Sequence, residues 1–392
     1  METFRRIAGD VGGIEIKMIY LDYAAAAPVR TEVVRNVEKY FANPSSMHDA
    51  GKKAKELLEN SREKIKKIMN ANIGDKIIFT SSGTESVNLA IKGVARAYIK
   101  KGNHIITSKV EHKAVLETCK YLEQEGFSVT YLDVDKYGRV NPKDVEKKIT
   151  AKTILVSIMY ANNEIGTIQP LQEIAAITKK KKVLFHSDAC QAGFLSLDMQ
   201  KLGIDLLTLN SNKIYGPKGA GLLYVREGVK LEPLIHGGGQ EFGLRSGTEN
   251  VAAIMGFGKA LGLAQAEKEK ENKNLCGLRD YFIKEVQKNI NEMILNGHPQ
   301  ERLPNNVHLS FESVEAETVL SYLNQRGIYA SAGSACTADE IEVSHVLKAM
   351  KVPEGLAKGS IRFSLGKETT KKNIDKVVKV LSEIITSLRK VF

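Results

Sequence analysis

Lys213 is the residue of this sequence with the clearest chemical potential. It lies in TLNSNKIYGPKG, residues 208–219, where an apolar run ends in a polar turn followed by a Gly-Pro-Lys-Gly bend. An amine held against apolar neighbours has a lowered pKa, and the neutral amine condenses with an aldehyde to a Schiff base. Taken alone, the stretch fits a solvated turn lysine better, because Lys and Arg number 57 in the chain. The remaining motifs must decide.

Two further motifs carry groups that suit such chemistry. SSGTES follows an apolar run and opens a helix, so the backbone at Gly83 and the Thr84 hydroxyl can hold a phosphate. Simple N-capping of the helix explains the same residues equally well. VLFHSD ends in Asp188, with Gln191 one helical turn further on, and a carboxylate that leaves a buried strand needs a partner. A protonated pyridine nitrogen is one such partner.

Polar residues also follow two other apolar runs. His112 comes shortly after HIITS, where a histidine commonly caps or packs, although beside an aldehyde-bearing ring it can stack and relay protons. Asn163 follows ILVSIMY in ANNEIG. Its amide can hydrogen-bond a ring oxygen, and a buried structural amide is the competing interpretation.

A thiol and a guanidinium complete the set of candidates. The four cysteines are widely spaced and include no CxxC pair, which fits neither a disulfide framework nor a zinc site. Cys336 lies among small residues in SAGSACTADE, unlike Cys119 and Cys276 in their apolar periodic segments. A thiol in such a run can attack a substrate sulfur. Arg362 in SIRFSLG offers a bidentate fork for a carboxylate.

Short apolar runs that alternate with helical patterns must position these groups. The alternation predicts an α/β fold in which a mostly parallel, seven-stranded sheet is covered by helices on both faces. Ligands bind beyond the carboxyl ends of the strands in such sheets, where Asn163, Asp188 and Lys213 fall. The predicted strands are 77–80, 104–108, 129–132, 154–160, 183–188, 206–210 and 221–225, and the predicted helices are 31–41, 51–69, 85–101, 113–124 and 170–180.

The pattern changes after residue 250, which predicts a second domain. A long helix to about residue 289 precedes mixed strands and helices, as expected for a smaller α+β domain. We expect an N-terminal extension at 1–17, a large domain at 18–265 whose first residues can join the small one, and a small domain at 266–392. A hinge is expected in the long helix near residues 262–272.

Composition excludes several classes of protein. No window approaches the roughly 20 apolar residues of a membrane span, and residues 1–18 lack the apolar run of a signal peptide, which favours a cytoplasmic protein. The net charge of +11 is spread along amphipathic helices. Because no nucleic-acid-binding signature accompanies it, we expect no direct nucleic-acid partner.

Ten motifs together resemble one known family. They follow the order and approximate spacing of the pyridoxal-phosphate cysteine desulfurases of the NifS/IscS type, class-V aminotransferases, from about Met18 to the C-terminus. The resemblance implies the fold type I of pyridoxal-phosphate-dependent transferases, and the length of the Cys336 run is closer to NifS/IscS than to SufS. The motifs are YLDYAAAAP, NPSSMH, FTSSGTESVN, IITSKVEH, NNEIGTIQP, FHSDACQ, NKIYGPKG, GGGQEFGLRSGTEN, SAGSACT and SIRFSLG.

The resemblance implies a role for each candidate residue. Lys213 is the Schiff-base lysine, Asp188 pairs with the pyridinium nitrogen, and His112 stacks on the ring. Cys336 is the nucleophile that forms a persulfide, and Arg362 holds the substrate carboxylate. The remaining implied contacts are to the cofactor from Gly83, Thr84, Asn163, Gln191, Asn210 and Asn212, to the substrate from Asn163, and to the phosphate of the neighbouring subunit from Thr248.

Some residues depart from the family pattern. Asn210, Ser211 and Asn212 stand where the family usually has Ser-Gly-His before the lysine. Amides still donate to phosphate but carry no charge, and each lost charge-assisted contact weakens phosphate binding by about 1.5–3 kcal/mol if nothing replaces it. These changes bear on cofactor affinity rather than on reaction type. The others are Ala26 and Ala27 in place of threonines and Tyr160 in place of histidine.

The expected function is conversion of L-cysteine to L-alanine with formation of a persulfide on Cys336. The resemblance implies a homodimer that passes sulfur to an acceptor or iron-sulfur scaffold protein, for cluster assembly or tRNA thiolation. One alternative is a related pyridoxal-phosphate lyase, for example on selenocysteine, or an aminotransferase, against which Cys336 argues. A second is a sulfur-relay or assembly subunit with weakened cofactor binding, suggested by Asn210 and Asn212.

Overall fold

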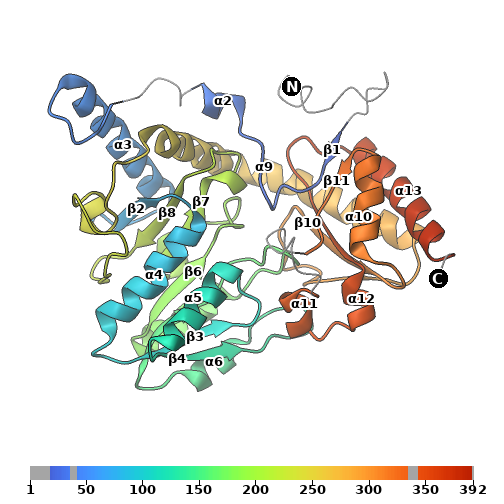
Figure 1. Cartoon of the computed structure of the whole chain (residues 1–392), viewed down its shortest axis with the longest axis horizontal. Helices are drawn as coiled ribbons and strands as arrows, with labels where there is room; N and C mark the ends of the chain where they lie inside the picture. Colours follow the sequence, from blue (N-terminus) through green and yellow to red (C-terminus); the bar gives the residue numbers. More distant parts are fainter. Residues whose placement is uncertain (1–17, 36–41, 334–342, 391–392) are drawn as a thin grey trace. The chain divides into compact units, whose positions relative to one another are not determined.

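The structure is a computed structural model that describes residues 18–35, 42–333 and 343–390 (Figure 1). Contacts divide the chain into two compact units. The larger unit comprises Ala26–Asn163 and Thr167–Glu269, and the smaller comprises Met1–Ala25, Glu164–Gly166 and Lys270–Phe392, as far as these are described. The predicted extension at 1–17 lies outside the described residues. Glu269 and Lys270 mark the division of the long helix, against residues 265 and 266 in the sequence prediction.

A seven-stranded sheet forms the centre of the larger unit (Figure 1). The strand order β2-β8-β7-β6-β5-β3-β4 leaves β8 antiparallel to both neighbours, while the pairs from β7 to β4 are parallel, so the prediction of a mostly parallel sheet is confirmed. The strands are β2 (Lys76–Thr80), β3 (His104–Ser108), β4 (Ser128–Leu132), β5 (Thr153–Ser157), β6 (Leu184–Asp188), β7 (Leu206–Asn210) and β8 (Gly221–Val225).

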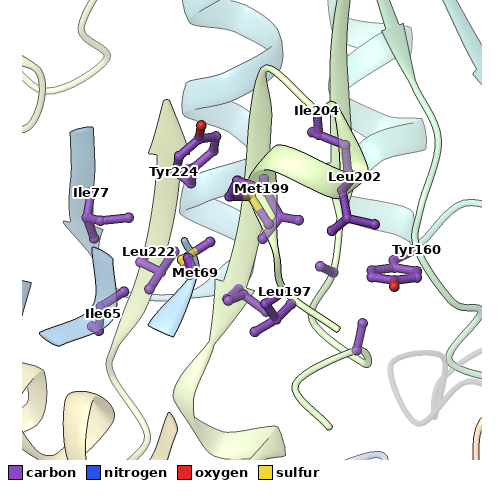
Figure 2. Packing of buried hydrophobic residues seen from close by; sticks show 14 of the residues in the cluster. Ile65, Met69, Ile77, Tyr160, Leu197, Met199, Leu202, Ile204, Leu222 and Tyr224 are labelled. Carbon is purple, nitrogen blue, oxygen red and sulfur yellow. The ribbon is translucent and has the colours of Figure 1, made fainter. Parts of the chain in front are cut away.

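Helices pack on both faces of this sheet because its strands are apolar on both sides. In β2, Ile77 joins one buried cluster with residues of α3 and α9, and Ile78 joins another with residues of α4 and α5. Figure 2 shows part of the first cluster, including Met69 at the end of α3 and Leu222 of β8. The helices are α2 (Thr31–Val34), α3 (Asp49–Ile68), α4 (Gly83–Tyr98), α5 (Lys113–Gln124), α6 (Pro142–Lys148), α7 (Leu171–Lys181), α8 (Met199–Leu202) and α9 (Val251–Asn289).

Some helices and strands begin or end at residues other than those predicted. Helix α4 begins two residues before the predicted residue 85, since the Ser82 side chain accepts a hydrogen bond from the Glu85 amide. Strand β5 ends at Ser157 rather than at Tyr160, so the prediction of a strand over 154–160 is too long. Of the helix expected at 31–41, only Thr31–Val34 is described as helix, and residues 36–41 lie outside the described residues.

The smaller unit has its own sheets and core. Strands β12, β10 and β9 form an antiparallel sheet in this order, and β1 pairs in parallel with β11. Helices α10 and α13 pack beside this sheet with the C-terminal half of α9. The elements are β1 (Ile19–Tyr20), β9 (Met293–Leu295), β10 (Asn306–Phe311), α10 (Ala316–Gln325), β11 (Ile328–Tyr329), α11 (His345–Ala349), α12 (Glu354–Lys358), β12 (Ser360–Ser364) and α13 (Lys371–Leu388).

A buried ion pair fixes the loop before α9 to the larger unit. Both Arg62 and Glu241 are at least nine-tenths buried, and their two hydrogen bonds measure 2.8 and 2.9 Å. Glu241 also accepts from the Phe79 amide at 2.8 Å. Because Glu241 has a φ of +48°, its left-handed backbone depends on these contacts. The second acidic partner of Arg62, Glu59, has a side chain that is 47% exposed.

Removal of Glu241 is therefore expected to cost much more stability than removal of Glu59. Glu241→Ala leaves the Arg62 guanidinium buried without its main partner, which lowers the free energy of unfolding by about 3–5 kcal/mol. Glu59→Ala, the matched control on the same arginine, is expected to cost no more than about 1 kcal/mol. Guanidinium chloride unfolding followed by circular dichroism measures both, and equal losses for the two variants would contradict this prediction.

No helix in the described ranges is both long and apolar enough to cross a membrane. Likewise, the residues that the structure describes contain no group of His, Cys, Asp and Glu side chains placed to hold a metal ion.

Candidate active site

The predicted site residues of the larger unit gather at one edge of its sheet. Strands β7, β6, β5 and β3 are parallel neighbours, so their carboxyl ends meet there. Strand β2 runs in the same direction, because two antiparallel pairings through β8 separate it from β7. The segments that leave these ends contain Gly83 and Thr84 after β2, His112 after β3, Asn163 after β5, Asp188 and Gln191 at and after β6, and Asn210 and Lys213 at and after β7.

The start of α4 lies against the segments after β6 and β7. A Cβ atom at Gly83 would come within 2.5 Å of the Cys190 sulfur and 3.6 Å of the Asn210 Nδ2 atom, so only glycine fits there. Thr84, the next residue, is exposed. The N-terminus of this 16-residue helix carries a partial positive charge, which favours an anion at this edge of the sheet.

Asp188 ends β6 with its side chain almost buried. It is 7% exposed, and its Oδ1 accepts from the Cys190 amide at 3.0 Å. Burial, with the nearby Asp188 carboxylate, raises the pKa of the Cys190 thiol well above its usual value. Two residues earlier on the strand, burial lowers the pKa of His186 to about 4, so this imidazole is neutral.

Lys213 is half-buried at the end of a short 3-10 turn, Ser211–Lys213. The turn is tied to its surroundings by the backbone, because the Ser211 amide donates to Ala220 O and the Ala27 amide donates to Asn212 O at 2.8 Å. A Cβ atom at Gly216 would overlap the Ser211 hydroxyl, which explains the glycine after Tyr215. These contacts hold the backbone of the turn from which the Lys213 side chain extends.

His112 caps α5, and the residue before it is a carboxylate that the sequence analysis missed. The His112 Nδ1 atom accepts from the Ala114 amide at 3.1 Å, so the neutral ring carries its proton on Nε2. Glu111 is fully buried and accepts from the Ser108 hydroxyl at 2.7 Å and the Met159 amide at 3.0 Å. Through these two hydrogen bonds, Glu111 links the end of β3 to the segment that follows β5. A carboxylate next to His112 in SKVEHK was the available signal.

The pKa of Glu111 predicts a pH-dependent stability. Burial raises this pKa to about 8, against hydrogen bonds from Ser108 and Met159 that lower it. Between about pH 4.5 and 8 the unfolded chain ionises this carboxyl while the folded chain keeps it protonated, so its stabilising contribution is lost as the pH rises. Relative to Glu111→Gln, the wild type is expected to lose about 1.4 kcal/mol per pH unit in this range.

Guanidinium chloride unfolding at pH 5, 6 and 7 measures the difference between wild type and Glu111→Gln. Glu117→Gln is the control, since the Glu117 side chain on α5 is 60% exposed and pairs with Lys120 at the surface. Parallel stability curves for wild type and Glu111→Gln would contradict the raised pKa.

The larger unit contains three further predicted site residues, Asn163, Gln191 and Thr248. Asn163 and Gln191 are half-buried after β5 and β6. Thr248 is exposed in the loop that precedes α9, and Arg245 of this loop pairs with Glu85 of α4 at 2.8 Å. Tyr160, one of the departures from the family pattern, donates to Ser196 O at 3.2 Å.

Arg362 belongs to the smaller unit. It lies on β12, is 2% exposed, and donates through Nη2 to Asp22 Oδ1 at 2.9 Å. Register places it opposite His308 of β10, whose pKa burial and the nearby arginines lower to about 3. The neutral His308 therefore adds no second charge beside the guanidinium. Cys336 lies outside the described residues.

Comparisons with known proteins show the family of the chain. The sequence model of the aminotransferase class-V family matches residues 19–377. The chain belongs to the aminotransferase class-V family. Its relatives include cysteine desulfurase IscS of Dictyoglomus turgidum, which is 52% identical over 376 residues, covering 95% of both chains. Cysteine desulfurase IscS of Methanosarcina thermophila is 50% identical, covering 97% of this chain and 95% of the relative.

Solved structures resemble this class-V enzyme over nearly its whole length. A NifS-like protein matches with a TM-score of 0.89 and 38% identity, covering 95% of this chain and all of the other. A NifS-like protein from Rickettsia africae matches with a TM-score of 0.86 and 32% identity, covering 94% and 100%. The likeness confirms the predicted fold type.

Pyridoxal 5′-phosphate is the cofactor of this family, and the residues present fit it. Its phosphate needs amide donors, and the start of α4 offers Gly83 without room for a side chain. The Asn210 Nδ2 atom, an amide donor, lies at the same place, 3.6 Å from the position that a Cβ atom of Gly83 would take. Asp188 supplies a carboxylate for the ring nitrogen and Lys213 an amine for the aldehyde. The donor set matches the chemical groups of the cofactor.

Proposed function

We propose that this protein is a cysteine desulfurase that converts L-cysteine to L-alanine and holds the sulfur as a persulfide on Cys336. The observation that carries the proposal is the placement of Asp188 and Lys213 at neighbouring strand ends beside the start of α4. Relatives named cysteine desulfurase at 50–52% identity over nearly the full chain support the same reaction. Nothing in the comparisons favours the lyase, the aminotransferase or the assembly subunit.

The larger unit supplies the acid–base groups. Bound pyridoxal phosphate provides an electron sink for the bond changes at the substrate carbon atoms. The Asp188 carboxylate holds the proton on the ring nitrogen, which keeps that sink charged. The Lys213 Nζ atom removes the proton from the substrate Cα and returns it later, and His112 carries protons at Nε2. The phosphate is bound by Gly83, Thr84, Asn210 and Asn212. The polar atoms of the ring are contacted by Asn163 and Gln191.

Cys336 carries the sulfur transfer. As a thiolate it attacks the sulfur of the substrate, which forms an S–S bond while the Cβ–S bond of the substrate breaks. The sulfur stays on Cys336 as a persulfide, and the remaining three-carbon amino acid is protonated to alanine. Arg362 binds the substrate carboxylate, and its hydrogen bond to Asp22 holds the guanidinium plane in one orientation.

The proposal also covers the oligomeric state of the protein and the acceptor of its sulfur. Thr248 lies exposed in the loop whose Arg245 pairs with Glu85 of α4, and it is proposed to contact the phosphate of a second copy in a homodimer. The persulfide is proposed to pass to an iron-sulfur scaffold or another sulfur-acceptor protein in the cytoplasm. We also propose that the two units act as the large and small domains, 18–265 and 266–392.

One experiment tests the reaction as a whole. Purified protein reconstituted with pyridoxal phosphate and incubated with L-cysteine and dithiothreitol is expected to release alanine and sulfide in equal amounts. Alanine without sulfide, or no product from cysteine while another amino acid is consumed, would refute the proposal. Treatment with borohydride before denaturation shows whether the cofactor is attached to the protein.

A further inference from the structure

Two buried polar side chains cross between the segments that follow β3 and β5. Glu111, in the segment after β3, accepts through Oε1 from the Met159 amide at 3.0 Å, in the segment after β5. In the opposite direction, Asn162 of the segment after β5 donates through Nδ2 to Val110 O at 2.7 Å, in the segment after β3. Both Glu111 and Asn162 are 0% exposed. We call these two residues the cross-brace.

Each residue of the cross-brace directly precedes a predicted site residue. His112 follows Glu111 in the chain, and Asn163 follows Asn162. The two site residues are half-buried at the carboxyl edge of the sheet, whereas the cross-brace is fully buried. A shift of either backbone segment therefore moves a site residue with it. Because each residue of the cross-brace reaches to the other segment, the two segments hold each other in place.

The segment after β5 is also anchored on its other side. The Tyr160 amide donates to Asp188 O at 2.8 Å, at the end of β6, and the Asn162 amide donates to Thr167 O at 2.9 Å. These bonds fix the backbone of this segment beside Asp188. Through the cross-brace, the segment after β3 takes its position from the same anchor. His112, Asn163 and Asp188 therefore belong to three segments that one set of hydrogen bonds connects.

We propose that Glu111 and Asn162 are positioning residues that hold His112 and Asn163 at a set spacing, so that both side chains meet the same cofactor ring. The inference rests on the proposed function, in which His112 carries protons and Asn163 contacts polar atoms of the ring. Buried hydrogen-bond networks specify one arrangement of the groups around them. Precise placement matters here, because a misplacement of about 1 Å can lower the rate of a catalysed reaction by about 10²-fold.

Loss of either side of the cross-brace tests the proposal in the holoenzyme. Asn162→Ala and Glu111→Ala are each expected to lower cysteine turnover by about tenfold. The visible circular dichroism of bound pyridoxal phosphate, which depends on the orientation of the groups around the ring, is expected to change in intensity by about half or more in both variants. Wild-type turnover and circular dichroism in both variants would refute the positioning role.

Glu111→Gln separates the hydrogen bonds of Glu111 from its ability to ionise. Glutamine keeps an oxygen that accepts from the Ser108 hydroxyl and the Met159 amide, and it matches the protonated carboxyl in shape. This variant is expected to retain the turnover and the circular dichroism of the wild type at neutral pH. A defect as large as that of Glu111→Ala would show that the carboxyl acts in another way, and the proposal would be wrong.

Thr107→Val is the matched control for a loss of stability. Thr107 of β3 is 0% exposed, and its hydroxyl donates to Ser157 O of β5 at 2.9 Å. The substitution therefore removes one buried hydrogen bond to a backbone carbonyl between the same strands, within the paired part of the sheet. It is expected to lower the denaturant midpoint as Asn162→Ala does, but to leave turnover and circular dichroism unchanged. Equal losses of turnover in the two variants would contradict positioning.

A combination of substitutions shows whether Asn162 acts through its neighbours. If it does, its removal matters only while the His112 and Asn163 side chains are present. In a chain that carries both His112→Ala and Asn163→Ala, the addition of Asn162→Ala is expected to leave the circular dichroism of the bound cofactor unchanged. A further change as large as the one that Asn162→Ala causes in the wild type would mean that Asn162 acts independently of them.

Chemical modification of His112 gives a readout that does not depend on the proposed reaction. In the full-length protein without substrate, Asn162→Ala and Glu111→Ala are expected to change the rate at which diethyl pyrocarbonate modifies His112 by about threefold or more. The exposed His48 serves as the internal standard. Equal His112 rates in wild type and both variants overturn the positioning role. If these rates differ although the wild type forms no alanine from cysteine, the proposed function fails and the positioning role stands.

Discussion

Cysteine desulfurase turnover is expected to fall by about 10³-fold or more in Cys336→Ser, while the visible absorption of bound pyridoxal phosphate stays as in the wild type. The reason is that a serine hydroxyl is not ionised near neutral pH and cannot take sulfur into a persulfide. The cofactor contacts proposed here come from other residues, all of the larger unit, so cofactor binding has no need of this thiol. Alanine and sulfide release in the presence of dithiothreitol measure the loss.

Cys276→Ser is the matched control for this substitution. Cys276 lies on α9 in the smaller unit and is half-buried, and the proposed mechanism gives it no role. Its replacement is expected to leave turnover unchanged. If Cys336→Ser retained wild-type activity, the enzyme would release sulfur without a protein thiol, as the alternative of a selenocysteine-type lyase requires, and the desulfurase proposal would be wrong.

The central sheet could be predicted from sequence because its strands are short apolar runs flanked by polar residues. β3, β7 and β8 have the predicted bounds, since Gly, Asn and charged residues mark their ends. The same rule misses β1 and β11, which are two residues long and pair across about three hundred residues. A periodic signal needs more residues than these strands contain, and their pairing is decided by tertiary contacts.

The groups at the strand ends were predictable, but the groups that support them were not. Asp188 and Lys213 could be found because a polar residue after an apolar run is visible in one dimension. Glu111 holds the ends of β3 and β5 together through Ser108 and Met159, a relation that exists only after the strands pair.

The departures from the family pattern before Lys213 have a partial structural answer. Asn210 lies against Gly83 at the start of α4, the place where a phosphate is expected, and its amide can donate there. The backbone of Asn212 is held by the Ala27 amide, so one of the alanines that replaces a threonine fixes the turn through its main chain. The phosphate contacts proposed for Asn210 and Asn212 come from neutral amides and use no histidine charge.

Lys213→Ala is expected to lower turnover by about 10²–10⁴-fold and to leave the cofactor without its covalent attachment. The Nζ atom of Lys213 is proposed both to bond the aldehyde and to move the proton at the substrate Cα, and alanine can do neither. The visible spectrum of the variant is therefore expected to resemble that of free pyridoxal phosphate. After borohydride treatment and denaturation, the cofactor is expected to remain with the wild type and to separate from Lys213→Ala.

Lys218→Ala provides the comparison within the same bend. Lys218 lies five residues further on and is exposed, whereas Lys213 is half-buried at the end of the 3-10 turn. Both substitutions remove one positive charge near the carboxyl end of β7, so a loss of activity through the overall charge would appear in both. The proposed chemistry requires a selective loss in Lys213→Ala. If both variants lost the same activity, or if borohydride still fixed the cofactor to Lys213→Ala, the reacting amine would belong to another residue. Lys213 would then have no role in the reaction.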